Sequence, residues 1–179
     1  MNGNTFASPW GKTLRWVSVL SVLLLLAVSV SIFWTTTPEP VRQAAWLPLL
    51  ILAVTALFAI RDYTIEPHEL LIRRLLWTTR VSLAGLQSAE FQPNAMRGSL
   101  RLCGNGGLFS FTGWYRNRAL GNYRAFVTEL KNTVVLKFAN KTVVVSPENP
   151  ERFVAEISQF ASRVSRLFYW YDTTLPQLW

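Results

Sequence analysis

The first third of the chain is dominated by two long apolar stretches. Val17–Phe33 is uncharged and almost entirely aliphatic, and a second uncharged stretch, Gln43–Ile60, follows after a short loop. At 1.5 Å per residue, about 18 helical residues extend roughly 27 Å, close to the hydrocarbon thickness of a bilayer. The pattern predicts a two-helix membrane hairpin with spans of about 16–35 and 44–61.

A cleaved signal peptide is the alternative for the first stretch, because Lys12 and Arg15 precede it. The apolar run is too long for that, and no small-x-small cleavage site follows it. An anchored hairpin is therefore the better interpretation. Trp16, Trp34 and Trp46 lie near the predicted span ends, where indole rings favour the headgroup layer, and we expect them to be membrane-interface anchors.

Beyond residue 61 the period changes to that of short strands separated by turn residues. No segment with a helical period interrupts these strands, which favours an antiparallel sheet or barrel over alternating βαβ units. Pro93–Ser99 is expected to be a loop. The predicted strand regions are Tyr63–Ile65, Leu70–Leu75, Thr79–Leu83, Ser88–Phe91, Leu108–Tyr115, Gly121–Glu129, Thr133–Phe138 and Val143–Val145.

One amphipathic helix follows the strands. Asn149 is a suitable N-cap, and Pro150 suits the first helical position. Apolar residues then recur at steps of four and three, which places them in one stripe. We expect this stripe to cover the domain's own sheet; recruitment of a partner helix is the alternative. Its members are Phe153, Ile157, Phe160, Val164 and Leu167.

The order of these elements resembles that of the bacterial pleckstrin-homology-like (PH-like) domains: two apolar spans, short strands, and a Ser-Pro-Glu-Asn-Pro-Glu segment before the helix. A membrane-associated branch of that family is similar in Gly104–Phe109, Thr112–Asn117, Leu120–Tyr123 and Val143–Pro147. The resemblance covers about residues 62–167.

The resemblance implies a membrane-anchored, mainly-β protein: a partly open barrel of about seven strands in two packed sheets, with the C-terminal helix capping one end. The expected organisation is an N-terminal tail and transmembrane hairpin (1–61), a PH-like domain (62–167) and an aromatic C-terminal tail (168–179).

The distribution of charged residues predicts how the hairpin is oriented in the membrane. The chain has 18 Lys+Arg against 10 Asp+Glu, a net charge of +8, and half of it is hydrophobic, so it is not a disordered chain. Glu39 and Arg42 cancel in the hairpin loop, whereas basic residues flank the spans. The positive-inside rule then predicts that both termini are cytoplasmic. With the resemblance to bacterial domains, this implies a multi-pass protein of the bacterial inner membrane. The flanking residues are Lys12, Arg15, Arg61, Arg73 and Arg74.

The sequence offers little for catalysis. His68 is the single histidine and Cys103 the single cysteine, so we expect no enzyme, no catalytic residues, no metal site and no cofactor. No basic helix or aromatic RNA-binding signature predicts nucleic acid as a partner. The glycines Gly104, Gly106 and Gly107 match no phosphate-binding motif, and we expect them to permit positive φ or close backbone approach.

Two functional classes remain. The favoured one is a structural or assembly subunit, whose hairpin packs in the bilayer against other membrane subunits or a second copy while its domain docks a partner. The aromatic tail is the candidate interface for this role: Phe168, Tyr169, Trp170, Tyr171 and Trp179.

The alternative is a membrane-surface module that binds lipid headgroups. Arg73, Arg74 and Arg80 lie on or near the strands with which eukaryotic relatives bind inositol phosphates, although the basic motif of those relatives is not cleanly reproduced. These three arginines are the candidate lipid- or anion-binding residues.

Overall fold

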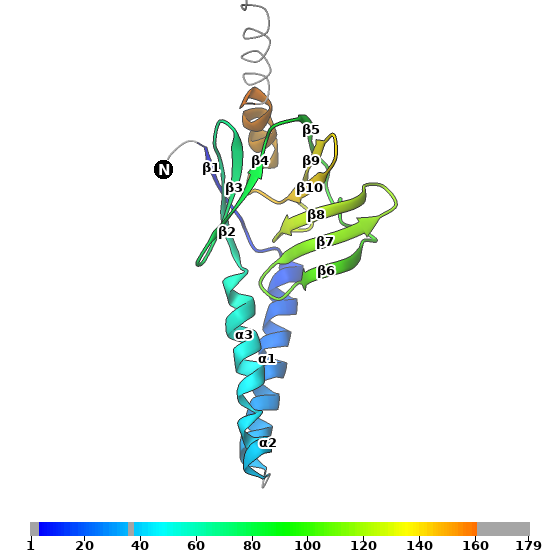
Figure 1. The fold of residues 1–179 in the computed structure, drawn as a ribbon. Helices are drawn as coiled ribbons and strands as arrows, with labels where there is room; N and C mark the ends of the chain where they lie inside the picture. Colours follow the sequence, from blue (N-terminus) through cyan, green and yellow to red (C-terminus); the bar gives the residue numbers. More distant parts are fainter. Residues whose placement is uncertain (1–3, 36–37, 161–179) are drawn as a thin grey trace, which may run out of the picture.

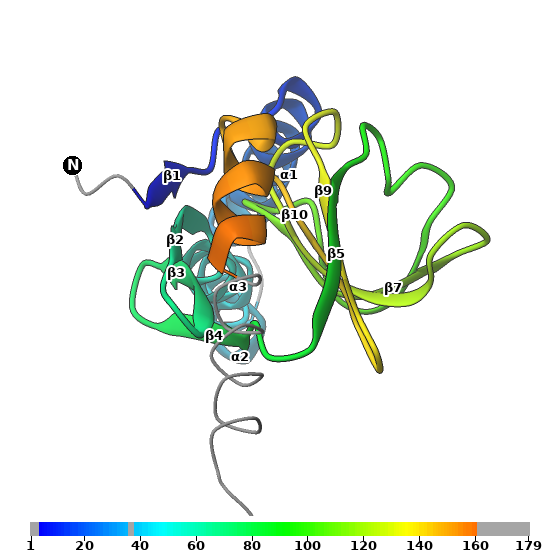
Figure 2. The ribbon, with the colours of Figure 1, turned by 90° about the horizontal axis from the view of Figure 1, so that it is seen from above.

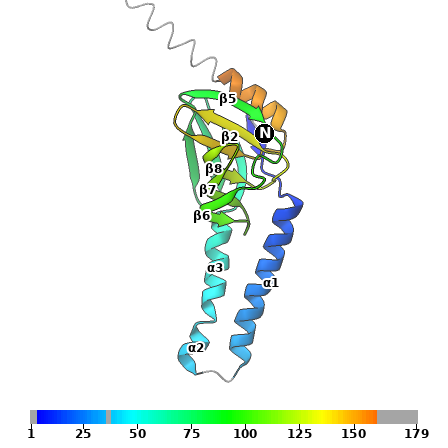
Figure 3. The same cartoon turned by 90° about the vertical axis from the view of Figure 1, so that its right-hand side faces the viewer.

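The structure, a computed structural model, describes residues 4–35 and 38–160. A helical hairpin projects from one end of a β-sheet domain (Figures 1 and 3). By length and composition, the segments Lys12–Trp34 and Glu39–Leu57 are both apolar enough to cross a membrane, and most of their surface is exposed. The helices of the hairpin are α1 (Lys12–Trp34), α2 (Glu39–Gln43) and α3 (Trp46–Leu57).

Small side chains allow the two arms of the hairpin to approach closely. The Ser29 hydroxyl in α1 donates a hydrogen bond to the carbonyl oxygen of Ala45, at 3.0 Å. Near the tip, the rings of Phe33 and Trp46 pack edge to face, with centroids 5.6 Å apart. The second long helix, α3, ends at Leu57, earlier than the predicted limit of residue 61, because β2 (Ile60–Ile65) already begins at residue 60.

The domain consists of two sheets that do not close into a barrel. The four-stranded sheet has the order β1-β2-β3-β4, with β1 (Thr5–Ala7), β2 (Ile60–Ile65), β3 (Glu69–Arg74) and β4 (Thr78–Ser82). The six-stranded sheet has the order β5-β9-β10-β8-β7-β6, with β5 (Leu86–Phe91), β6 (Leu100–Gly106), β7 (Phe111–Asn117), β8 (Gly121–Val127), β9 (Val134–Phe138) and β10 (Thr142–Val145).

Two expectations about the sheets need correction. The described residues form ten strands, against the about seven that the resemblance implied, and one of them comes from the N-terminal tail. The expected antiparallel arrangement also has an exception, because β10 runs parallel to β8. The β9–β10 hairpin inserts β10 between β9 and β8, and this placement fixes its direction relative to β8.

The six-stranded sheet is covered on both faces. One face packs against the four-stranded sheet and the C-terminal helix, and Phe126, Leu136 and Val145 belong to this core. The other face forms a smaller core, in which Tyr115 and Tyr123 lie with Ala95 and Met96 of the loop after β5. Seen from above, the C-terminal helix (orange) lies over the opening between the two sheets (Figure 2).

The residues before the first helix form an edge strand of the domain. In β1, Thr5 pairs with Thr64 and Ala7 with Asp62 of β2. The Phe6 side chain is buried, and its ring packs edge to face on Phe153 with centroids 5.2 Å apart. The sequence assigned these residues to a tail; the structure joins them to the four-stranded sheet.

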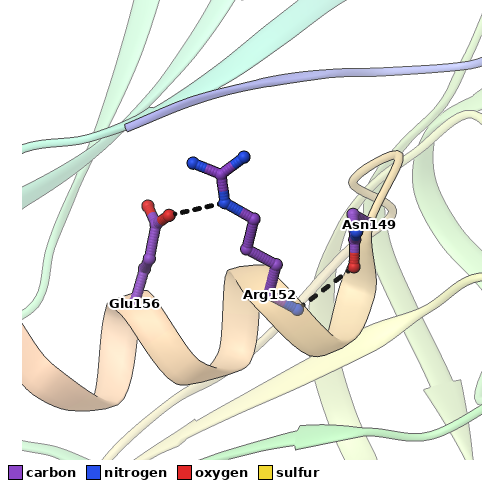
Figure 4. Close-up of polar contacts among 3 residues, drawn as sticks. All are labelled: Asn149, Arg152 and Glu156. Carbon is purple, nitrogen blue, oxygen red and sulfur yellow. Dashed lines mark hydrogen bonds and ion pairs between the residues drawn. The ribbon is translucent and has the colours of Figure 1, made fainter. Parts of the chain in front are cut away.

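The C-terminal helix begins as predicted. The Asn149 side-chain oxygen accepts a hydrogen bond from the Arg152 backbone N–H at 3.2 Å, which is N-cap geometry (Figure 4). Helix residues 150–160 are described. Phe153 and Ile157 are fully buried, and Phe160 is partly buried against the same core. The remaining stripe positions Val164 and Leu167, and the aromatic tail 168–179, lie outside the described residues.

Candidate functional site

A pocket of about 590 Å³ lies where α3 ends and the β-sheet domain begins. We call it the junction pocket. Thr55 and Phe58 contribute one wall from the end of α3, and Arg74 lies at the end of β3. The remaining lining residues come from β6, β7, the turn between them and β8: Arg101, Cys103, Gly104, Asn105, Leu108, Thr112, Gly113, Trp114 and Arg124.

The register of β6, β7 and β8 explains this wall. Thr112 pairs with the core residue Phe126, and one step further along the same face Trp114 pairs with Arg124. Cys103 of β6 pairs in turn with Trp114. The inner face of the six-stranded sheet therefore continues from the core into the pocket, where Cys103 and Trp114 are exposed.

Arg74 is directed inward by the two-residue period of β3. Leu70 and Ile72 on the same strand face are fully buried, and the Arg74 residue as a whole is only 7% exposed. Its guanidinium carbon lies 5.5 Å from the ring centroids of Phe58 and Trp77. The Arg74 Nε is buried and has no hydrogen-bond acceptor among the described residues.

Arg124 adds a second positive charge beside Arg74. Its guanidinium carbon lies 4.9 Å from the Phe126 ring centroid, and that of Arg74 lies 5.6 Å from the same ring. Burial lowers the pKa of Arg74, and the nearby charge of Arg124 lowers this pKa further. An arginine nonetheless stays protonated in a protein, so both groups are cationic.

No carboxylate offsets these charges in the part of the chain that the structure describes. The described ion pairs include neither Arg74 nor Arg124 nor Arg101. The lining contains no acidic residue, and the Arg101 guanidinium donates instead to the carbonyl oxygen of Gly104, at 3.3 Å. The junction pocket is therefore a site of uncompensated positive charge.

Two glycines allow β6 and β7 to approach each other next to the pocket. Gly104 and Gly113 are paired and have φ of +118° and +139°. A Cβ on Gly104 would lie 2.2 Å from the carbonyl oxygen of Thr112, and one on Gly113 would lie 2.1 Å from that of Cys103. The predicted role of Gly104, positive φ with close backbone approach, is confirmed.

The β6–β7 turn is attached to both arms of the hairpin. The Ser18 hydroxyl of α1 accepts a hydrogen bond from the Phe109 N–H and donates one to the Gly107 carbonyl. The Ser110 hydroxyl donates to the carbonyl oxygen of Phe58 at the end of α3, at 3.1 Å. These bonds fix the position of the domain relative to the two helices.

The structure separates the three arginines that the sequence grouped. Arg73 and Arg80 lie on the outer face of the four-stranded sheet, 3.7 Å from Asp62 and 3.8 Å from Glu69, respectively. Arg74 points to the opposite face, so the three do not form one site as the grouping suggested. The inward direction of Arg74 could have been predicted from the sequence, because Arg74 continues the alternation of the apolar residues Leu70 and Ile72.

Arg101 and Arg124 were missed by the sequence reasoning. Arg124 lies two residues before the apolar Phe126 in β8, which places both on one strand face. Its proximity to Arg74, however, depends on the packing of the two sheets and has no local sequence signal.

Apolar side chains are exposed beside the pocket. Arg74 pairs with Ile60 at the start of β2, so the turn that follows Arg74 lies level with the end of α3. This turn, Leu75-Leu76-Trp77, is called the apolar turn here. Leu75 and Leu76 are 54% and 71% exposed, and Trp77 is 37% exposed.

The three predicted anchor tryptophans lie at both ends of the hairpin. Trp16 is near the domain end of α1, whereas Trp34 and Trp46 are near the tip, and all three are exposed. This arrangement agrees with two interfacial layers separated by the length of the helices. Their contact with a membrane remains a prediction.

Among residues 4–35 and 38–160, no group of three or more His, Cys, Asp or Glu side chains gathers in a way that could hold a metal ion. Cys103 is exposed on β6 and lines the junction pocket, and His68 lies in the connection between β2 and β3.

The comparisons identify the family of the domain. A family model described as bacterial PH domain matches residues 61–161, more than half of the chain, from β2 to the C-terminal helix. Searches among curated proteins and among solved structures find no match. Two sheets with a C-terminal helix over their opening agree with the matched family, and the chain belongs to the bacterial PH domain family.

Proposed function

We propose that the protein is a non-enzymatic integral membrane protein that holds its PH domain against the cytoplasmic surface of the bacterial inner membrane. The apolar turn is the observation that carries this proposal. Leu75, Leu76 and Trp77 are exposed at the level where α3 ends. A cluster of exposed leucines and an indole is costly in water and favourable in the headgroup layer of a bilayer.

The pairing of β1 with β2 supports a hairpin topology. β1 precedes α1 and β2 follows α3, yet the two strands are hydrogen-bonded neighbours. This pairing supports a topology in which both ends of the hairpin lie on one side of the membrane and the chain crosses the bilayer twice.

The charge distribution supports the cytoplasmic side. At the tip of the hairpin Arg42 forms an ion pair with Glu39, which leaves little net charge there. At the domain end, Lys12 and Arg15 lie in the first turn of α1, and Arg61 follows α3 at the start of β2. An excess of basic residues close to the helix ends favours the cytoplasmic side.

The lining of the junction pocket supports a non-catalytic role. It offers guanidinium, hydroxyl, amide and thiol groups, but its described residues include no carboxylate or imidazole to act as a general base. Its chemistry is suited to binding.

The test uses the full chain in lipid nanodiscs. Leu76→Cys in a Cys103→Ser background is labelled with an environment-sensitive fluorophore, and lipids with nitroxide groups near the headgroup serve as quenchers. We expect strong quenching at position 76. Ser158→Cys, exposed on the C-terminal helix at the far end of the domain, is the matched control and should stay unquenched.

Equal quenching at the two positions, or none at position 76, would refute the proposed placement. Reporter fusions after residue 160 provide the second readout, and an external reporter would refute the cytoplasmic orientation.

The second candidate function is a structural or assembly subunit. It is favoured by β6, an edge strand without a neighbour on one side among the described strands, with Leu100 72% exposed and Leu102 57% exposed. Such an edge can accept a strand from another membrane subunit or a second copy. Leu102→Lys should then abolish a stoichiometric complex in mild detergent, whereas Ser158→Lys should preserve it. A complex unaffected by Leu102→Lys would refute this role for β6.

A further inference from the structure

The junction pocket combines positive charge and apolar surface at the end of a candidate membrane helix. Resting on the placement proposed above, and extending it, we propose that this pocket binds one net-anionic glycerophospholipid. Its phosphate lies between Arg74 and Arg124, within reach of Arg101, and the upper part of an acyl chain lies against Phe58 and Trp114.

The charge of the pocket requires an acceptor. Arg74 is only 7% exposed, and its Nε has no hydrogen-bond acceptor among the described residues. Arg124, which is itself exposed, contacts the same Phe126 ring as Arg74. Two guanidinium groups that share a ring repel each other, and an anion between them would relieve this repulsion while accepting their N–H groups.

The same charge selects the headgroup. A zwitterionic headgroup would bring an ammonium group into a pocket that holds three arginines and, in its described lining, no carboxylate. A headgroup with net negative charge avoids that repulsion. The pocket should therefore prefer phosphatidylglycerol to phosphatidylcholine, although both carry a phosphate.

The apolar lining argues for a lipid over a soluble phosphate. Phe58 at the end of α3, Leu108 in the β6–β7 turn and Trp114 in β7 offer apolar surface that a small inorganic anion would leave unused. The volume of about 590 Å³ lies in the usual range of small-molecule sites and suits a headgroup with the first part of its chain. Because Thr55 and Phe58 form one wall, the rest of the lipid continues alongside α3.

The experiment uses the native Cys103 thiol as the reporter, because it lines the pocket and is the only cysteine in the chain. The full protein is placed in nanodiscs of phosphatidylcholine alone or of phosphatidylcholine mixed with phosphatidylglycerol, and the rate of maleimide addition to Cys103 is measured. Native mass spectrometry of the detergent-purified protein counts the retained phosphatidylglycerol. We expect phosphatidylglycerol to slow the modification and to be retained as one molecule per chain.

The matched variants each remove one positive charge. Arg124→Gln should weaken phosphatidylglycerol protection of Cys103 about ten- to hundredfold, the usual effect of losing a charged hydrogen bond. Arg73→Gln is the control, because Arg73 adjoins Arg74 in β3 but lies on the opposite face beside Asp62. It should leave both protection and lipid retention unchanged. Arg124 is exposed, so the test does not depend on altering the buried Arg74.

Three results would overturn the proposal. Equal weakening by Arg124→Gln and Arg73→Gln would show diffuse attraction to an anionic surface. Protection of Cys103 by glycerol phosphate as strong as that by phosphatidylglycerol would show a site for soluble anions. Equal modification rates in both nanodiscs would show no lipid site. If position 76 is still quenched in that last case, only the lipid site fails; loss of that quenching removes the proposed placement as well.

Discussion

The hydroxyl of Ser18 holds the backbone of Phe109: it accepts the Phe109 N–H at 3.0 Å, while its own proton is donated to the Gly107 carbonyl at 3.2 Å. Phe109 has a φ of +65°, which is uncommon for a residue other than glycine. One serine in a candidate membrane helix therefore supports a turn of the β domain that requires an unusual backbone conformation.

Ser18→Ala should loosen the attachment of the domain to the hairpin. The Phe109 N–H loses its acceptor in a part-buried position, which costs about 1–3 kcal/mol. Faster proteolysis within the β6–β7 turn of the full protein in detergent would report the loss. Ser31→Ala is the control, because Ser31 is exposed and its hydroxyl donates to the Val28 carbonyl of its own helix. Equal proteolysis of both variants would contradict this role of Ser18.

Phe6→Ala should destabilise the domain although residue 6 precedes the first helix of the hairpin. The ring is buried and packs on Phe153, so its loss should cost about 3–5 kcal/mol. Chemical denaturation of the full chain in detergent, followed by near-ultraviolet circular dichroism, measures the change. Ala7→Ser on the exposed face of β1 should change stability by less than about 0.5 kcal/mol. A Phe6→Ala effect as small as this would mean that β1 adds nothing to the core.

Ile157→Ala tests the cover that the C-terminal helix gives to the sheets. Ile157 is fully buried, and its truncation should lower the free energy of unfolding by about 2–5 kcal/mol. Phe160→Ala should cost less, because that side chain is only partly buried. The exposed Ser158→Ala is the control, and denaturation of the full chain measures all three. A loss at Ile157 no larger than that at Ser158 would exclude this packing.

Gly113→Ala should disrupt the β6–β7 pairing. The added Cβ would meet the Cys103 carbonyl oxygen at 2.1 Å, so the two strands would have to separate. Gly85→Ala is the control for a positive φ without crowding: its φ is +73°, and the added Cβ meets nothing within 4 Å. Gly85→Ala should cost about 1 kcal/mol from backbone strain alone, and Gly113→Ala clearly more. Amide exchange in β6 and β7 distinguishes the two, and equal protection would contradict the close approach.

Stability should fall as the pH rises above 10. Burial raises the pKa of Tyr63, Tyr123 and Tyr115, that of Tyr115 to about 12. The unfolded phenols ionise near pH 10 while the folded ones keep their protons, so stability is complete below pH 10 and declines through the folded pKa values. Denaturation midpoints between pH 9 and 12 measure the decline.

Tyr63→Phe should flatten that decline and lower stability at neutral pH by about 1–3 kcal/mol. The Tyr63 hydroxyl donates to the Phe126 carbonyl and accepts from the Ser146 N–H, and both groups lose a partner. A midpoint that does not depend on pH in the wild-type chain would contradict the raised pKa values.

Local pattern predicted most strands and the start of the C-terminal helix, because alternation and capping are properties of neighbouring residues. The three-residue strand β1 was not predicted, because its partner strand β2, in which Thr64 pairs with Thr5, is far along the chain. The intervening helices bring the two strands together. The parallel pairing of β10 with β8 escaped for a similar reason: it depends on where the β9–β10 hairpin inserts.

The candidate site was predicted less well than the fold. Basic residues on β3 were noticed, but Arg73 and Arg74 point to opposite faces, and only Arg74 lines the junction pocket. The charge that completes the site, Arg124, comes from β8, and its contact with the Phe126 ring that Arg74 also contacts depends on sheet packing. The alternation along a strand predicts which sheet face a side chain occupies. It does not predict which residues of two strands from different sheets come into contact.

The pairing of Thr5 with Thr64 also sets an order of events during synthesis. β1 leaves the ribosome first but has no partner until both helices and β2 have followed. In the proposed topology, the four-stranded sheet is therefore complete only after the hairpin has returned to the side of the membrane from which it started. A chain whose second helix failed to return would carry an unpaired β1 and an uncovered Phe153, the kind of exposed surface that quality-control proteases degrade.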